Sequence, residues 1–275
     1  MRPERPFAVR ILTSAALAAA LALSLAGCKT TGDDITGSIG ASSQTPRTDA
    51  DWRAYAQVWG KRYHDNPADA QAAMAYAAAL RATDQRAQAV AVLRQAALHN
   101  SDNKPLLGAY GRALADAGEY QQALDTLSRA HTPDNPDWRI LNAQGAVLDQ
   151  MGRHKDAQRY YASALKMMPN EPSVLSNLGL SYALQKDLKR AEQTLRQAAA
   201  QPNARPKVRQ NLALIVGLEG RFAEAEKIAR ADLPPAQAEA NVAYLREMLA
   251  RQKQFTTRGR HRREPPPYVS PSGNS

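Results

Sequence analysis

The sequence is short of the residues that most catalytic and metal sites need. Its single cysteine excludes an internal disulfide and any metal site built from several cysteines. The five histidines are scattered, and none stands at a metal-ligand spacing from another histidine, a cysteine or a carboxylate. There is no HExxH or GxSxG motif and no phosphate-binding glycine loop. We therefore expect no catalytic activity, no metal and no cofactor.

Aromatic residues are also scarce, at 6% of a chain in which 44% of the residues are hydrophobic. Alanine accounts for much of the hydrophobic content that is not aromatic. This composition is typical of a helical protein with a thin, continuous core. A length of 275 residues allows one or two domains.

The net charge of +10 is concentrated at the two ends of the chain. Residues 1–28 carry +2 and residues 251–275 carry +5, which leaves +3 for everything between them. Within the basic end, residues 254–275 combine arginines with a Pro-Pro-Pro-Tyr run and are predicted to be disordered. Such a tail is either simply solvated or weakly attracted to anionic lipid or cell wall.

Residues 1–27 are typical of an export signal. Three arginines precede an uncharged run that is rich in alanine and leucine. The run ends in Leu25, Ala26, Gly27 and Cys28, and this motif resembles the lipobox of bacterial lipoproteins. The alternative is an uncleaved anchor, because the uncharged run approaches the length of a membrane-spanning helix.

The lipobox resemblance implies cleavage before Cys28 and lipidation of its thiol, with a further acyl chain such as palmitate on the new amino terminus. Two or more acyl chains hold a protein firmly in a membrane. Lys29 replaces the aspartate that often marks inner-membrane retention, so we expect a lipid anchor at the periplasmic face of the outer membrane. That location excludes nucleic acid as a partner. Residues 28–50, rich in Gly, Ser and Thr, are predicted to be a flexible tether.

The central part of the chain, residues 70–237, repeats itself every 34 residues. Alanine fills one column of the repeat, very small residues fill a second, and large apolar residues fill a third. These columns are Ala89, Ala123, Ala157, Ala191 and Ala225; Ala77, Gly111, Gly145, Gly179 and Ala213; and Leu80, Leu114, Leu148, Tyr182 and Val216. Within one half of a unit, the columns are spaced as on one face of a helix, and a glycine between the halves ends the first helix. Each unit is therefore predicted to be a helical hairpin that buries its apolar face against its neighbours.

These columns resemble the tetratricopeptide repeat, which has the same period and the same order of small and large residues. The resemblance implies an all-α fold, a superhelix of about five hairpins with a capping helix at each end. About twelve helices are expected in total. For function, the resemblance implies only that the chain binds another molecule, most often a protein.

Incomplete elements are expected on both sides of the repeats. Residues 51–67 form a partial repeat in which Asp51 is the predicted N-cap and four aromatic residues share one helical face: Trp52, Tyr55, Trp59 and Tyr63. We interpret these aromatics as a cap over the first repeat rather than as a binding surface. Two prolines end the last repeat, and residues 236–253 are predicted to form a C-terminal capping helix.

In tetratricopeptide stacks the first helix of each hairpin lines the ligand groove. The resemblance therefore implies ligand contacts at the non-core positions of these helices, which are Met74, Arg81, Arg112, Asp116, Arg139, Asn142, Asp149, Ser176, Asn177, Lys207, Gln210 and Asn211. Arginine, asparagine and glutamine suit the capture of a peptide's amides and carboxylates. For Asn177 and Asn211 a structural role is the alternative, because both match the repeat consensus. Family members that bind chaperone tails clamp the terminal carboxylate with Lys and Asn. Met74 and Ala78 stand at those positions here, so this clamp is missing.

Two local stretches add a more specific resemblance. They are Leu-Gly-Leu-Ser-Tyr-Ala-Leu at residues 178–184 and Asn-Val-Ala-Tyr-Leu-Arg at residues 241–246. With the lipobox, the tether and the aromatic helix, they resemble the TadD family, outer-membrane lipoproteins of the tight-adherence (Flp) pilus assembly system. This implies an adaptor for a pilus secretion complex, with the outer-membrane secretin as a candidate partner. A lipoprotein of the β-barrel assembly machinery and a scaffold for cell-wall enzymes remain the alternatives.

Overall fold

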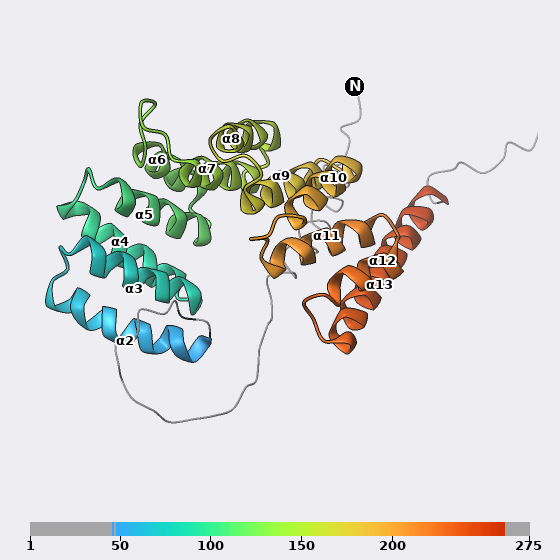
Figure 1. Ribbon diagram of the computed structural model, residues 1–275, viewed down its shortest axis with the longest axis horizontal. Helices are drawn as coiled ribbons and strands as arrows, with labels where there is room; N and C mark the ends of the chain where they lie inside the picture. Colours follow the sequence, from blue (N-terminus) through green and yellow to red (C-terminus); the bar gives the residue numbers. More distant parts are fainter. Residues whose placement is uncertain (1–45, 47, 262–275) are drawn as a thin grey trace, which may run out of the picture. The chain divides into compact units, whose positions relative to one another are not determined.

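The computed structural model describes residue 46 and residues 48–261 (Figure 1). This part of the chain forms twelve helices and no strand beyond one isolated bridge between Thr132 and Asn135. In order, the helices are α2 (Asp49–Asp65), α3 (Ala70–Ala82), α4 (Arg86–His99), α5 (Lys104–Asp116), α6 (Tyr120–Arg129), α7 (Trp138–Gln150), α8 (His154–Met167), α9 (Pro172–Leu184), α10 (Leu188–Ala199), α11 (Pro206–Leu218), α12 (Phe222–Ala229) and α13 (Pro235–His261). The all-α prediction and the expected number of helices are confirmed.

The helices divide into two compact units between Ala204 and Arg205. In the first unit, α2 packs on α3, and the hairpins α3–α4, α5–α6, α7–α8 and α9–α10 follow one another, each touching the next. In the second unit, α11 and α12 form the fifth hairpin, and α13 packs against both of its helices. The five predicted hairpins are therefore all present.

The alternation of small and large residues explains how the two helices of a hairpin approach each other. A Cβ atom at Gly111 would lie 2.5 Å from Leu127 Cγ, and one at Gly145 would lie 2.5 Å from Tyr161 Cε1. The alanine column faces the same seam and is completely buried in all five hairpins, at Ala89, Ala123, Ala157, Ala191 and Ala225. The small residues therefore set the helix spacing, and the large ones fill the seam.

The turn inside each hairpin uses a left-handed residue at one fixed position of the repeat. Gly118, Gly152 and Gly220 have φ of +82°, +75° and +86°, a region that costs glycine no steric strain. Asp84 and Lys186 occupy the same position in the first and fourth hairpins, with φ of 62° and 67°. The turn geometry is thus kept even where the sequence has no glycine.

The start of α2 differs from the sequence-based prediction. The N-cap is Thr48, not Asp51, and the helix begins at Asp49. Thr48 Oγ1 accepts a hydrogen bond from the Asp51 backbone N–H at 3.1 Å, and Asp51 Oδ2 accepts one from the Thr48 N–H at 2.9 Å. This reciprocal capping box needs a hydroxyl residue first and an acid three residues later, which only this choice of N-cap supplies. The predicted tether 28–50 therefore overlaps the beginning of a helix.

The aromatic residues of α2 face the first repeat at one end. Tyr63 is buried, and its ring centroid lies 5.9 Å from that of Tyr76 on α3. A Cβ atom at Gly60 would come within 3.1 Å of the Tyr76 ring, so α2 and α3 are closely packed there. Trp52 and Trp59 each contact Tyr55 at 5.8 Å between centroids and stay half-buried. The helix covers the start of the first repeat.

The C-terminal helix is longer than predicted. Residues 236–253 were expected, whereas α13 runs from Pro235 to His261 and takes in the first part of the segment 254–275, which was predicted to be disordered. The buried residues Ala238, Val242 and Leu245 hold its first half against the fifth hairpin. No proline occurs between Pro235 and Pro265, so no residue removes a donor from the helical hydrogen-bond ladder.

Several predictions concern residues outside the described part of the chain. These are the export signal 1–27, the lipidation at Cys28, most of the tether, and the tail from residue 262 onward. They stay predictions. Over residue 46 and residues 48–261, none of the helices is long and apolar enough to cross a membrane.

Candidate binding surface

The residues predicted to contact a ligand lie on the first helices of the hairpins. In the first unit these are α3, α5, α7 and α9, and each contacts the next directly. The side chains that point away from the second helices form the surface that we call the first-helix face. Lys207, Gln210 and Asn211 lie on α11, in the second unit.

An ion pair connects the first two hairpins on this face. Arg81 of α3 donates from Nε to Asp116 Oδ2 of α5 at 2.5 Å, and both side chains are partly exposed. Both residues were predicted to contact a ligand. The structure instead joins them, so the Asp116 carboxylate is already partly neutralised.

Arg112 lies on the same face of α5 without such a partner. Its side chain is half-buried, and among the described residues no carboxylate forms a hydrogen bond or ion pair with it. Its terminal nitrogen Nη1 lies 3.5 Å from the place where Gly108 would carry a Cβ atom, so the guanidinium lies along α5. Burial, above all, and then the positive charge of Arg81 lower the pKa of Arg112, and Asp137 and Asp116 only partly oppose them.

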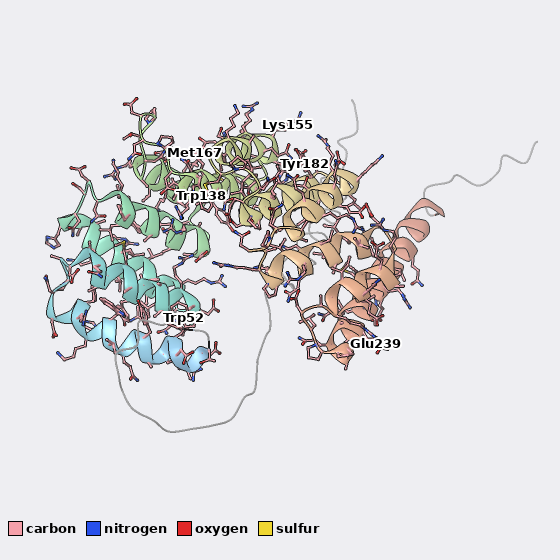
Figure 2. All side chains as sticks on the ribbon, in the orientation of Figure 1. Trp52, Trp138, Lys155, Met167, Tyr182 and Glu239 are labelled. Carbon is pink, nitrogen blue, oxygen red and sulfur yellow. The ribbon has the colours of Figure 1, made fainter. Side chains whose placement is uncertain are left out.

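Arg139 extends the positive charge to the third hairpin. It is exposed at the start of α7, and its guanidinium carbon lies 4.5 Å from the ring centroid of Trp138, the residue labelled on α7 in Figure 2. Asp137, which the sequence analysis did not single out, caps α7 by accepting a hydrogen bond from the Arg139 backbone N–H at 2.7 Å. Arg139 also contributes to lowering the pKa of Arg112, so the two arginines sense each other's charge.

Amide side chains continue the face toward the fourth hairpin. Asn177 of α9 donates from Nδ2 to Asn142 Oδ1 of α7 at 3.0 Å, and both residues are half-buried. The two asparagines predicted for the groove therefore act first as a contact between repeats.

Three of the predicted ligand contacts belong to the interior instead. Asp149, Ser176 and Asn211 are buried, with exposed fractions of 9%, 4% and 4%. A 34-residue pattern identifies the first helix, but it does not separate the side that faces the next helix from the side that stays open. These three residues are removed from the candidate surface. Met74 is half-buried and packs against the core beneath α3.

Asp149 is the centre of a buried hydrogen-bond network that the sequence analysis missed. Its Oδ1 accepts from Ser181 Oγ at 2.8 Å and lies 2.9 Å from His154 Nδ1, while Oδ2 accepts from Tyr161 OH at 2.9 Å. Burial raises the pKa of Asp149, and the bonds with His154, Ser181 and Tyr161 oppose that rise. The network joins α7, α8 and α9, so it links the third and fourth hairpins.

A signal for this network was present in the sequence. Tyr161 stands in a column that otherwise holds leucine and alanine, at Leu93, Leu127, Leu195 and Ala229. A tyrosine buried in such a column needs a partner for its hydroxyl group. Burial also raises the pKa of Tyr161, and the neighbouring Asp149 raises it further. Over the described residues, no group of three or more potential metal ligands gathers at this or any other place.

Comparisons with known proteins agree with this architecture. Residues 150–215 match the family model of the tetratricopeptide repeat. The sequence matches no protein of curated function at a significant level.

Similar solved structures are found at low sequence identity. PilW, described as a widely conserved type IV pilus biogenesis factor, has a TM-score of 0.60 at 17% identity, over 70% of this chain and 91% of PilW. The APC/C heterotetramer Cut9–Hcn1 has a TM-score of 0.59 at 15% identity, over 74% of this chain and 40% of that chain. Human IFIT1 has a TM-score of 0.57 at 16% identity, over 76% of this chain and 52% of that chain. At such identities the likeness shows the fold alone, and the fold is an all-α superhelix of tetratricopeptide-repeat hairpins.

Proposed function

We propose that this chain is a lipid-anchored adaptor that helps to assemble the secretion machinery of a tight-adherence (Flp) pilus at the periplasmic face of the outer membrane. Tetratricopeptide repeats serve protein–protein interaction, and the described residues offer one face suited to it. The observation that carries the binding role is Arg112, a half-buried cation on the first-helix face that forms no ion pair with any of the described residues. A charge in that state is available to an acidic partner from outside the fold.

The assignment to a pilus rests on resemblance. The stretches at 178–184 and 241–246 resemble the TadD family, and the lipobox at Leu25 to Cys28 fits the same family. One similar fold, PilW, is a type IV pilus biogenesis factor. Within this proposal, the outer-membrane secretin of the pilus system is the first partner to test.

Deletion of the gene tests the proposal. We expect the mutant cells to lose surface pili and surface adherence while growth and outer-membrane composition stay normal. A plasmid copy of the gene should restore both properties, which serves as the control. Pilus counts by electron microscopy and adherence assays measure the result.

Two outcomes contradict the proposal. Cells that remain piliated and adherent after the deletion would exclude a role in the pilus. A lethal deletion would favour the β-barrel assembly machinery instead, because that machinery serves all outer-membrane barrels.

A further inference from the structure

We infer that the first-helix face of α3, α5 and α7 binds an acidic segment of a protein partner in extended conformation, and that Arg112 and Arg139 hold its carboxylates. The inference rests on the proposed adaptor function and names the chemistry of the partner. We call Arg81, Arg112, Arg139, Asp116 and Asp137 the arginine cluster.

The charges of the arginine cluster do not balance. Its three arginines face two aspartates, and both aspartates already have partners within the fold. Asp116 is bound to Arg81 of the neighbouring hairpin, and Asp137 caps the helix that begins at Trp138. The cluster therefore keeps an excess positive charge, centred on Arg112 and Arg139.

The state of Arg112 is unfavourable in the free protein. An arginine taken partly out of water loses hydration, and here no hydrogen-bonded acid within the described chain replaces it. Two further arginines lie close enough to lower its pKa by repulsion. A carboxylate from a partner would relieve both costs at once, because the guanidinium fork matches the two oxygens of a carboxylate.

The spacing of the arginines suggests the form of the ligand. They lie on three consecutive first helices, and packed helices are about 8–10 Å apart. An extended chain in the polyproline II form advances about 3.1 Å per residue with three residues per turn. Acidic side chains at every third position would then lie on one side of the peptide, about 9 Å apart, and would meet neighbouring hairpins. Trp138, next to Arg139, offers an apolar ring at one end of the cluster (Figure 2). An acidic segment with a regular spacing of acids therefore fits better than a single carboxylate.

Peptide binding to the full-length protein, purified in mild detergent, tests the inference. The probe is a fluorescent peptide with glutamate at every third position, and its matched control carries glutamine instead. We expect saturable binding of the glutamate peptide, measured by fluorescence anisotropy, and at least about tenfold weaker binding of the glutamine peptide, as for the loss of charge-assisted hydrogen bonds. The affinity should also fall as the salt concentration rises.

Three variants locate the site. Arg112→Gln and Arg139→Gln should each weaken binding of the glutamate peptide by about tenfold. Arg94→Gln makes the same change in charge on α4, a second helix, where Arg94 is exposed, and should bind as the unmodified protein does. Because Arg139 is exposed, its variant keeps the test valid if the Arg112 variant does not fold.

The melting temperature separates a binding role from a structural one. Since Arg112 is a half-buried charge that no acid within the described part of the chain bonds, Arg112→Gln should leave the melting temperature unchanged or raise it. A clear fall in the melting temperature of Arg112→Gln, with binding lost in proportion to unfolding, would show that the residue supports the fold and would overturn the inference.

Other results also overturn it. Equal binding of the two peptides would exclude carboxylate recognition. If Arg94→Gln weakens binding of the glutamate peptide as much as Arg112→Gln does, only the overall charge of the protein matters. Tighter peptide binding after Asp33→Asn with Asp34→Asn would assign the cluster to these two aspartates of the chain's own tether.

The two proposals fail in different ways. If the gene deletion abolishes pili but Arg112→Gln cells stay piliated and the variant binds the peptide normally, the adaptor function stands and the arginine cluster is not its binding site. If peptide binding depends on Arg112 and Arg139 but the deletion mutant keeps its pili, the site stands and its partner lies outside the pilus.

Discussion

Arg112 and Asp149 lie on neighbouring first helices and were both predicted to contact a ligand, yet their surroundings are opposite. Both carboxylate oxygens of Asp149 have hydrogen-bond partners within the fold, in Ser181, His154 and Tyr161. Arg112 is partly desolvated and has no hydrogen-bonded acid among the described residues. A buried charge with partners supports the structure, whereas one without partners is available for a ligand.

The Asp149 network should contribute measurably to stability. Asp149→Ala leaves the buried Tyr161 and Ser181 hydroxyls without their acceptor, and one such unsatisfied group costs about 1–3 kcal/mol. Asp149→Asn should cost less, because the amide still accepts at one atom and a hydroxyl can turn to accept from the other. Urea denaturation of both variants measures the free energy of unfolding. Equal stability of Asp149→Ala and the unmodified protein would contradict the prediction.

The pH dependence of this network has a defined sign. Burial raises the folded-state pKa of Asp149 above 3.8, so the folded state holds this proton more tightly than the unfolded state. The contribution of this carboxyl group to the free energy of unfolding is therefore complete below pH 3.8, and it is lost as the pH rises through the folded-state pKa. The unmodified protein should therefore lose stability relative to Asp149→Asn across this window. If the difference in free energy of unfolding between the unmodified protein and Asp149→Asn stays constant with pH, the raised pKa of Asp149 is contradicted.

At the scale of the helix, the spacing within a hairpin depends on residues that have almost no side chain. Gly145 of α7 faces the Tyr161 ring of α8, and a Cβ atom would approach that ring to 2.5 Å. The ring has little room to move, because its hydroxyl group is bound to Asp149. The helices α7 and α8 can therefore accept a larger residue at this position only by separating.

Gly145→Leu should destabilise the third hairpin more than any substitution on the first-helix face. Overpacking of a closely packed seam costs about 1–3 kcal/mol, or more where backbone must shift. For a domain of this size, the melting temperature should fall by about 2–4 °C per kcal/mol. Ala146→Leu is the control, since it adds the same side chain one residue later, at a half-exposed position. A melting temperature unchanged in Gly145→Leu would place the small-residue column outside the seam.

At the scale of the whole molecule, the chain joins a folded helical body to a predicted lipid anchor. The body consists of two compact units that meet in sequence at Ala204 and Arg205. Most of the excess positive charge lies in the two ends of the chain rather than in the repeats. The proposed location therefore depends on Cys28 and the export signal, and the proposed binding depends on the body.

Cys28→Ser should abolish the lipid anchor, because no other thiol exists to accept the diacylglycerol. We expect no labelling by radioactive palmitate, and a chain that is either released in soluble form or retained with its signal still attached. Thr30→Ser, two residues after the motif, is a control that should be labelled normally. Unchanged labelling and membrane fractionation of Cys28→Ser would disprove the lipobox interpretation.

The sequence by itself determined the architecture, because a repeat reports the same contact several times. One small residue facing one large residue is weak information, but five registers with a period of 34 residues left no other arrangement than stacked hairpins. The buried alanine column and the close approaches at Gly111 and Gly145 follow that pattern. The helix ends were less certain, since Thr48 and Asp51 both suit an N-cap and only the capping box distinguishes them.

Only the tertiary structure decided which polar residues of the first helices are available to a ligand. Periodicity places Arg112, Asn142 and Asp149 on the first helices, but burial depends on side chains from other helices. For Asp149 these are Tyr161 of the same hairpin and Ser181 of the next one. These partners are 12 and 32 residues away from Asp149, and their positions follow from the packing of hairpins rather than from any local spacing. For the same physical reason, the unpaired state of Arg112 emerged only once its neighbours on α3 and α7 were in place.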